Sequence, residues 1–352
     1  MKEQTSMKER IQAFLDDFGL TRLVAILFFL AVAIAVPMLH LNTLTLYSQA
    51  LTRMAMNAVL VLTMVPIMVC GAGMNFALPI GIICGLIGGL ISLNMNLTGF
   101  TGFFLAILFS LPFSLVLGFL YGQLMNRVKG SEMMIATYVG YAVISVMCIV
   151  WLFIPLDNLI LRMQMGRGVR KDVLLSSYWE KILDRFLQVN IGGLVIPTGT
   201  IVFVLVMCFL VWLFLRSKTG TMMRIAGQNP GLAEANGIDV DRMRIWGITI
   251  STVLGGIGIL VYAQSLGFLQ FYESPKMMSF SAVAAVLIGG ASNKKASIFN
   301  VLFGVMVFQG LLTLSLPVAN VILPESNISD IVRMIISNGI ILYALAKGAK
   351  QK

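Results

Sequence analysis

The chain has 352 residues, of which 58% are hydrophobic and 11% are charged, and its formal net charge is +10. Soluble domains carry about 25% charged residues, so this composition and a mean hydropathy of +0.92 predict a protein that crosses the membrane many times. The basic residues lie mainly at the ends of apolar segments, so membrane topology explains them and no nucleic-acid partner is expected. One histidine and four widely separated cysteines predict no metal site, no cofactor and no disulfide framework.

Apolar runs long enough to cross a membrane recur along the whole chain. A spanning helix needs roughly 20 apolar residues. The first run, Leu23–Leu39, follows a polar segment, and we interpret it as a span that enters from the cytoplasm rather than as a cleaved signal peptide. Further spans are expected near residues 53–70, 75–93, 101–125, 132–154, 199–215, 245–266, 279–291, 297–316 and 329–346.

The predicted fold is an all-α polytopic membrane protein with about ten transmembrane helices in a single permease-like domain, residues 1–352. Both termini are then cytoplasmic, and most Lys and Arg residues lie on the cytoplasmic side. Leu86-Ile-Gly-Gly89 recurs as Leu287-Ile-Gly-Gly290, and the first copy ends outside whereas the second ends inside. This pairing of spans 2–5 with spans 7–10 indicates an inverted repeat, which is common in transporters.

A break in the apolar pattern at Val69–Gly81 contains two glycines before Asn75 and a proline after it. Irregular backbone at membrane depth is tolerated where protein buries it or where it lines a cavity. Asn75 therefore either lines a solute path or satisfies backbone groups that the break sets free. Asn57, Gln264 and Gln309 are further candidates for the path, and interhelical hydrogen bonding is the alternative for each.

Residues 155–198 form the longest segment that we expect on the extracytoplasmic side. Ser177 and Glu180 have the spacing of a capping box, and an amphipathic helix is expected to follow them. Its apolar face would contain Trp179, Leu183, Phe186 and Leu187. Such a helix would lie on the outer membrane surface or act as a docking platform for an extracytoplasmic protein, and both can be true.

Residues 216–244 form a cytoplasmic loop with the signals of a short helix. Asn229 is a good N-cap, Pro230 suits the first helical position, and Gly237 supplies a stop. A helix of barely two turns is unstable alone, so it must be held against another surface. Five basic residues flank it, namely Arg216, Lys218, Arg224, Arg242 and Arg244. The pattern predicts a helix at the cytoplasmic membrane surface that is presented to a soluble partner.

The sequence contains no G-x-x-x-x-G-K-[ST] motif, so we expect no ATPase activity in the chain itself. Its acidic residues lie near the ends of the spans, whereas a proton-coupled carrier usually needs a deeper carboxylate. These features favour a transporter that is powered by another subunit. A self-contained secondary carrier or channel is the alternative, and in that case the 216–244 loop would be dispensable.

The cytoplasmic loop resembles that of permease subunits of bacterial ABC importers, in the subfamily for simple sugars such as ribose and galactose, with nucleoside and branched-chain amino acid relatives. The residues that carry the resemblance are Thr219-Gly220, Arg224-Ile-Ala-Gly227-Gln-Asn229-Pro230, Ala233 and Gly237-Ile-Asp-Val240. Gly122-Gln-Leu-Met-Asn126, Thr137 and Ser281–Gly290 resemble the middle and C-terminal segments. Sugar permeases of this type often carry Gly-Gly-Ile-Asp-Leu-Ser where this chain has Gly73-Met-Asn75-Phe-Ala77, so a carboxylate and a hydroxyl are missing.

The resemblance implies a multi-pass subunit of the bacterial inner membrane that works by alternating access in membrane lipid. Its partners would be a cytoplasmic ATP-binding subunit, an extracytoplasmic solute-binding protein, and a second permease chain, identical or different. The solute would be a simple sugar or nucleoside, with branched-chain amino acids as the alternative. The coupling helix to the ATPase would contain Asn229, Pro230, Gly231, Leu232, Ala233, Glu234, Ala235 and Gly237.

Overall fold

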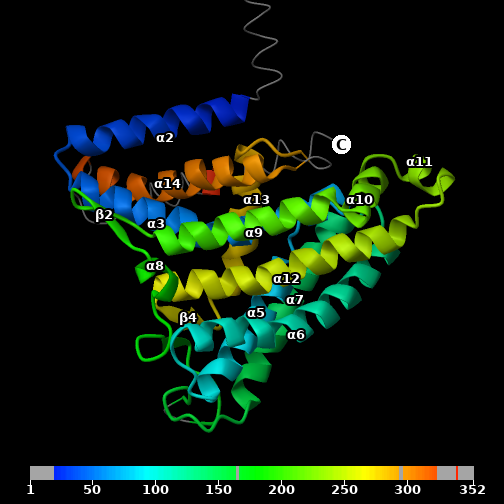
Figure 1. Cartoon of the computed structure of the whole chain (residues 1–352), viewed down its shortest axis with the longest axis horizontal. Helices are drawn as coiled ribbons and strands as arrows, with labels where there is room; N and C mark the ends of the chain where they lie inside the picture. The colour runs from blue at the N-terminus through cyan, green and yellow to red at the C-terminus, as the bar shows by residue number, and fades with distance from the viewer. Residues whose placement is uncertain (1–19, 164–165, 293–295, 323–337, 340–352) are drawn as a thin grey trace, which may run out of the picture.

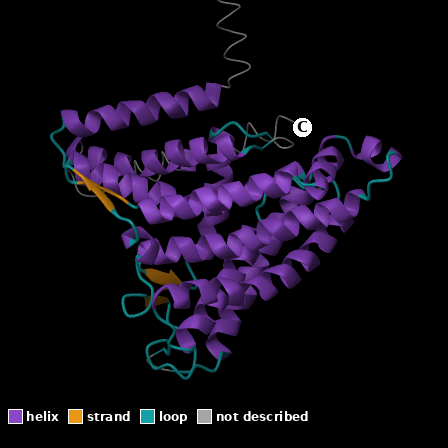
Figure 2. Ribbon diagram, viewed as in Figure 1, coloured by secondary structure: helices purple, strands orange, loops and turns teal. Residues whose placement is uncertain are grey.

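The computed structural model describes residues 20–163, 166–292, 296–322 and 338–339. Figure 2 shows that nearly all of this structure is helical. The larger helices are α2 (Leu20–Met38), α3 (Thr43–Leu62), α5 (Leu78–Asn94), α6 (Gly99–Arg127), α7 (Glu132–Phe153), α9 (Thr198–Arg216), α10 (Lys218–Gln228), α12 (Val240–Leu266), α13 (Ser274–Ile288) and α14 (Ile298–Ile322). The short helices are α4 (Met64–Val69), α8 (Ile182–Arg185) and α11 (Pro230–Ala235), and the strands are β1 (Asp172–Leu174), β2 (Val189–Ile191), β3 (Leu194–Ile196) and β4 (Phe268–Gln270).

These helices confirm the prediction of an all-α polytopic membrane protein. Six are long and apolar enough to cross a membrane, with α3 and α4 acting as one 27-residue span, and three shorter apolar helices are α2, α5 and α13. The described helices therefore match nine of the ten expected spans. The tenth, near 329–346, lies outside the described residues except for Asn338 and Gly339, as do the terminal segments 1–19 and 340–352.

Several predicted boundaries differ from the structure; for example, α12 begins at Val240 rather than at 245, and α14 ends at Ile322 rather than at 316. The second span was expected from residue 53, but α3 begins at Thr43, where the Asn42 side chain accepts a hydrogen bond from the Thr45 amide. The polar residues between 45 and 53 lowered the mean hydropathy of this stretch. They nevertheless lie in α3, where they line a pocket described below. The eighth span was expected at 279–291, but α13 covers Ser274–Ile288.

The helices run side by side, and their two ends differ in character (Figure 1). α10 and α11 lie at one end, whereas α8 and the strands lie at the opposite end. Helix α12 packs at the centre against α5 along a contact of glycines. A Cβ on Gly81 would lie 3.0 Å from the Gly255 Cα, and a Cβ on Gly85 would lie 2.3 Å from the Gly256 carbonyl oxygen. Such close approach requires glycine on both helices, as in other membrane helix pairs.

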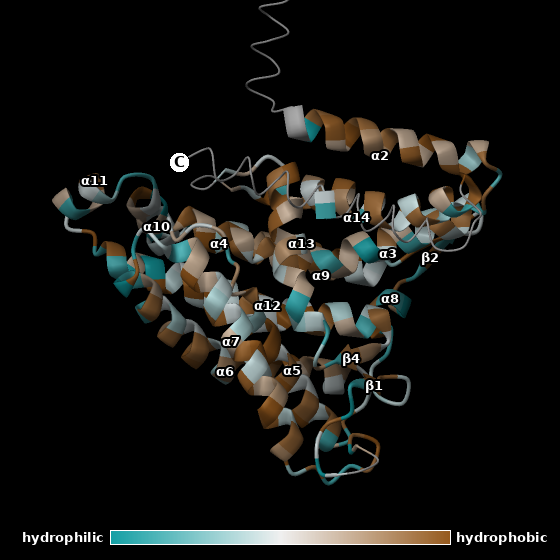
Figure 3. Ribbon diagram, turned by 180° about the vertical axis from the view of Figure 1, so that it is seen from behind, coloured by the Kyte–Doolittle hydropathy of each residue, from teal (hydrophilic) through white to brown (hydrophobic). Residues whose placement is uncertain are grey.

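Helices α2, α6 and α7 are largely apolar, as their colouring by hydropathy shows (Figure 3), and each carries large apolar side chains that are exposed. Exposed examples are Leu27 and Ile34 on α2, Leu108 and Phe119 on α6, and Ile149 on α7. Exposed apolar surface of this extent suits contact with lipid rather than with water.

The 155–198 segment is a compact cap on the helix ends and does not contain the expected amphipathic helix. Its helical part is the single turn α8, and Lys181 just before it has a left-handed φ of 49°. Trp179 and Leu183 are buried, but Phe186 and Leu187 are exposed, so these side chains do not share one face.

Tertiary hydrogen bonds explain this correction. The Lys181 amide donates to the Gln264 carbonyl oxygen, and the Leu183 amide donates to the Gln264 side chain, so both bind α12 instead of a local helix. Two antiparallel pairs complete the cap: β1 with β4, in which Val173 lies opposite Leu269, and the β2–β3 hairpin.

Candidate functional site

The break between α4 and α5 is held by Asn75. The backbone adopts left-handed conformations at Gly71 (φ 76°) and Gly73 (φ 83°), which glycine reaches without strain. The Asn75 side chain is 2% exposed, and its Nδ2 donates to the Ser251 Oγ at 2.8 Å. Ser251 in turn donates to the Thr63 carbonyl oxygen at 2.8 Å, at the junction of α3 and α4. The Asn75 Oδ1 is buried and has no hydrogen-bond partner among the described residues.

The other predicted path residues do not gather around Asn75. Gln264 is fully buried, and its Oε1 accepts a hydrogen bond from the Leu183 amide at 3.2 Å, so it fastens the 155–198 cap to α12. It lies 13 residues beyond Ser251 on the same helix, which corresponds to about 20 Å. Asn57 is half-buried on α3 and donates to the Arg53 carbonyl oxygen, and Gln309 is buried on α14. In this conformation Gln264 has an interior, structural position, and the four residues line no common cavity.

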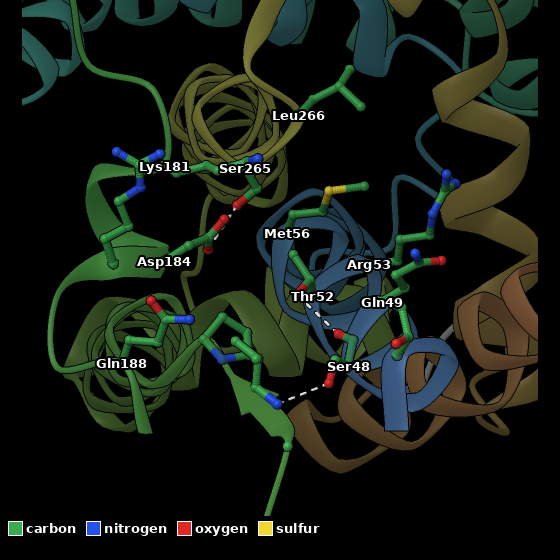
Figure 4. Close-up of a pocket in the computed structure, with 15 residues that line it drawn as sticks. Ser48, Gln49, Thr52, Arg53, Met56, Lys181, Asp184, Gln188, Ser265 and Leu266 are labelled. Atoms are coloured by element: carbon green, nitrogen blue, oxygen red, sulfur yellow. Dashed lines mark hydrogen bonds between the residues drawn. The ribbon is translucent and has the colours of Figure 1, made fainter. Parts of the chain in front are cut away.

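A polar pocket of about 680 Å³ lies at the end of the helices that is covered by the 155–198 cap (Figure 4). It is lined by the first half of α3, the 181–197 segment, and Ser265 and Leu266 at the end of α12. Sequence reasoning missed this pocket because it placed the start of the span at residue 53. The signal was nevertheless present in the polar residues at helical spacing, namely Thr45, Ser48, Gln49, Thr52 and Arg53.

Two rows of side chains on α3 contribute to the lining of the pocket. Figure 4 shows Ser48, Thr52 and Met56 on the side that faces Asp184, whereas Gln49 and Arg53 lie on the other side of the helix. The second row continues a stripe with a spacing of four residues, Thr45, Gln49, Arg53 and Asn57. Residues four apart share one face of a helix, so this stripe is a polar face on a membrane-spanning helix.

The pocket is rich in positive charge. Its basic residues are Arg53, Lys181 and Arg185, and Asp184 is its one acid. Asp184 is buried and already accepts hydrogen bonds from Thr200 and from Ser265, the latter at 3.0 Å. Within the described residues, no carboxylate lies within 4.0 Å of the Arg53 or Arg185 side chains.

At the opposite end, α11 forms as the local signals predict. Asn229 caps the helix by accepting a hydrogen bond from the Leu232 amide at 3.1 Å, and Pro230 occupies the first turn. Gly237 has a φ of 73° and ends the segment. Ala233 is fully buried, whereas Leu232 is exposed on a helix that projects beyond its neighbours (Figure 1).

The helix before α11 touches the Asn75 break directly. A Cβ on Gly227 of α10 would lie 2.1 Å from the Val69 carbonyl oxygen and 2.8 Å from the Gly71 nitrogen. Gly247 of α12 meets the same segment, since its Cβ would lie 2.6 Å from the Cys70 Sγ. Two helices, α10 and α12, therefore pack closely against residues 69–71.

Two ion pairs join the turn between α6 and α7 to the start of α12. Arg244 donates to the Glu132 carboxylate at 2.8 Å, and both side chains are largely buried. Lys129 pairs with Asp241 at 2.5 Å in a more exposed position. These contacts fix the first turns of α12, which directly follows α11. Among the described residues, no cluster of three His, Cys, Asp or Glu side chains could hold a metal ion.

These features define a polytopic membrane permease whose short helix α11 projects beyond the other helices at one end. Residues 18–345 match the family described as the branched-chain amino acid transport system / permease component, and the chain belongs to that family. No solved structure matches the chain.

Curated relatives match it over shorter stretches. It is 32% identical over 101 residues to the nucleoside ABC transporter permease protein NupC of Lactococcus lactis, a match that covers 28% of this chain and 32% of the relative. It is 31% identical over 91 residues to the guanosine ABC transporter permease protein NupQ of Bacillus subtilis, covering 26% and 28% of the two chains. The fructose import permease protein FrcC of Rhizobium meliloti is 28% identical over 120 residues, covering 34% and 33%. The matches therefore span about a third of each relative.

Proposed function

We propose that this chain is the membrane-spanning subunit of an ATP-driven importer for a small polar solute of the sugar or nucleoside class. Family membership and the similarity to nucleoside, guanosine and fructose permeases support the transport role. The contact of Gly227 with the Asn75 break carries the mechanism, because it joins a cytoplasmic docking helix to the segment that interrupts a span. The protein would function in the bacterial inner membrane with both termini in the cytoplasm.

The proposed partners follow from the two ends of the molecule. A cytoplasmic ATP-binding subunit docks on the helix at residues 229–237, and a solute-binding protein docks on the outer cap, with 155–198 and Glu273–Lys276 as its surface. A second permease chain, the same or different, completes the assembly. The chain itself performs no ATP hydrolysis. It provides the pathway for the solute and transmits the movement of α11 to that pathway.

Movement of α11 reaches residues 69–71 through rigid contacts of α10. ATP-driven closure of the partner displaces α11, and α10 moves with it because the two are joined at Asn229. Since Gly227 leaves no space at Val69 and Gly71, that displacement must move the break. The hydrogen bond between Asn75 and Ser251 then breaks, and the Asn75 side chain becomes available to a polar solute. Its Oδ1, which has no partner among the described residues, would accept a hydrogen bond from that solute.

Reconstitution tests this function. The chain is purified with the proteins that accompany it, placed in liposomes, and assayed with and without ATP for uptake of fructose, guanosine, fructose 1-phosphate and guanosine 5′-monophosphate. We expect uptake only with ATP and with a co-purified ATPase. Equal uptake in ATP-free liposomes by the chain alone would overturn the proposal in favour of a secondary carrier or channel.

A further inference from the structure

The polar stripe on α3 places a charged side chain inside a membrane span. Arg53 lies ten residues after Thr43, the first residue of α3, which corresponds to about 15 Å along the helix. Its side chain is exposed, as are Thr45 and Gln49 on the same face, and Asn57 further along is half-buried. A guanidinium at this depth cannot face hydrocarbon without a large cost, so this face of α3 borders a water-filled path.

Among the described residues, no carboxylate balances the charge of Arg53. The one acid of the pocket, Asp184, lies on the other side of α3 and is engaged by Thr200 and Ser265. Arg53 makes no ion pair with a described carboxylate. A guanidinium with five donors and no anionic partner is suited to bind a carboxylate or a phosphate.

Resting on the proposed function, we propose that Arg53 binds an anionic group of the transported solute, so that the solute combines a carboxylate or phosphate with a hydroxylated body. The amides of Gln49 and Asn57 flank Arg53 one turn away on either side and offer donors and acceptors to hydroxyl groups. A pocket of about 680 Å³ falls in the range of small-molecule sites.

Two other sources of an anion fit the position less well. Lipid headgroups stay at the membrane surface, whereas Arg53 lies about 15 Å inside its helix. The described spanning helices of a second copy offer no carboxylate at that depth, because they carry their acids only in the first turn, as Glu132 and Asp241 do. A soluble anion that enters through the pocket reaches Arg53 without these obstacles.

The test measures the electrostatic field at Arg53 with a cysteine placed one turn away. Gln49→Cys is made in a full-length chain whose four native cysteines are replaced by alanine, and the chain and its accompanying subunits are placed in nanodiscs of zwitterionic lipid. Labelling rates are compared for an anionic sulfonate and a cationic trimethylammonium methanethiosulfonate reagent. Thr98→Cys, exposed at the start of α6 and outside the pocket, serves as the control position.

We expect the sulfonate reagent to react about tenfold faster than the cationic one at position 49, relative to the same ratio at position 98. Arg53→Gln should abolish this preference, and Arg53→Lys should retain it. A ratio near one at both positions, or one that Arg53→Gln leaves unchanged, overturns the proposal. So does the absence of labelling at position 49, since the path would then be closed to solutes.

Protection by soluble probes tests the class of solute. Fructose 1-phosphate and guanosine 5′-monophosphate should slow labelling at position 49, whereas fructose and guanosine should not, and Arg53→Gln should remove the protection. Equal protection by the neutral probes overturns the anionic assignment. Protection that appears only after an anionic lipid is added assigns Arg53 to a headgroup and also overturns it. ATP-dependent uptake of the neutral solutes in that case would leave the importer function standing.

Discussion

Gly227 on α10 lies against Gly71 in the break between α4 and α5, at a distance that only two glycines allow. A Cβ on Gly71 would lie 2.9 Å from the Gly227 Cα, and a Cβ on Gly227 would lie 2.1 Å from the Val69 carbonyl oxygen. The first residue belongs to the 216–244 loop and the second to an interrupted span. Movement of one therefore cannot be absorbed by side chains and must displace the backbone of the other.

The substitution Gly227→Ala tests this contact. The added methyl group forces the two backbones apart, and such overpacking costs about 1–3 kcal/mol. We expect solute uptake to fall at least tenfold while the partner ATPase still co-purifies. Gly231→Ala is the matched control, because its methyl group would meet only the Asn229 Oδ1, at 3.7 Å. Equal uptake by the two variants would contradict the proposal that the contact between Gly227 and Gly71 transmits movement to the span.

Glu234 tests the docking surface itself. It is exposed on α11, so reversal of its charge alters what the partner meets and leaves the chain's own core intact. We expect Glu234→Lys to impair transport and ATPase co-purification without a change in membrane insertion, and Glu234→Gln to have a smaller effect. Uptake by the lysine variant at the normal level, with native expression, would argue against docking at this residue.

The ion pairs at the start of α12 differ in burial, and their contributions to stability should differ accordingly. Side-chain exposure is 8% for Arg244 and 21% for Glu132, against 48% and 52% for Lys129 and Asp241. Arg244→Gln leaves a largely buried carboxylate unpaired, so we expect a loss of about 3 kcal/mol and a clear drop in Tm in detergent. Lys129→Gln should cost less than about 1 kcal/mol. Similar Tm values for the two variants would show that burial of the first pair does not govern its effect.

Asn75 donates a hydrogen bond to Ser251 through Nδ2, and its Oδ1 has no partner among the described residues. A structural role and a role in binding solute therefore predict different effects of substitution on uptake. Loss of the bond to Ser251 alone should cost about 1 kcal/mol. If Asn75 also meets the solute, Asn75→Ala should reduce uptake about tenfold more than Ser251→Ala does, when both are compared at equal amounts of folded protein. Proteoliposome uptake at several solute concentrations measures this difference. Equal losses in the two variants would assign Asn75 a purely structural role.

The helix α11 could be predicted because its signals are local. An N-cap at Asn229, a proline at the first position and a glycine at Gly237 specify a short helix without help from the rest of the chain. The outer cap could not be predicted in the same way. The backbone after Ser177 bonds to Gln264 of α12 in place of the local helix that its sequence favours.

The polar pocket was not predicted from the sequence, for a different reason. Hydropathy treats Gln49, Thr52 and Arg53 as evidence against a span, although polar residues belong in a spanning helix that borders water. Their spacing, rather than their average polarity, carries the information. The predicted path residues were chosen one at a time as isolated polar positions. Gln264 and Asn75 were therefore grouped together, although Gln264 lies about 20 Å along α12 from Ser251, the hydrogen-bond partner of Asn75.

The most direct test of the account replaces residues 229–237 with a Gly/Ser linker and purifies the tagged chain from its native membrane in mild detergent. The account predicts that the native chain retains a co-purifying ATPase with measurable activity and that the linker variant loses it while keeping its level in the membrane. A linker variant that retains both the ATPase and solute uptake would contradict the role of α11 as the coupling helix.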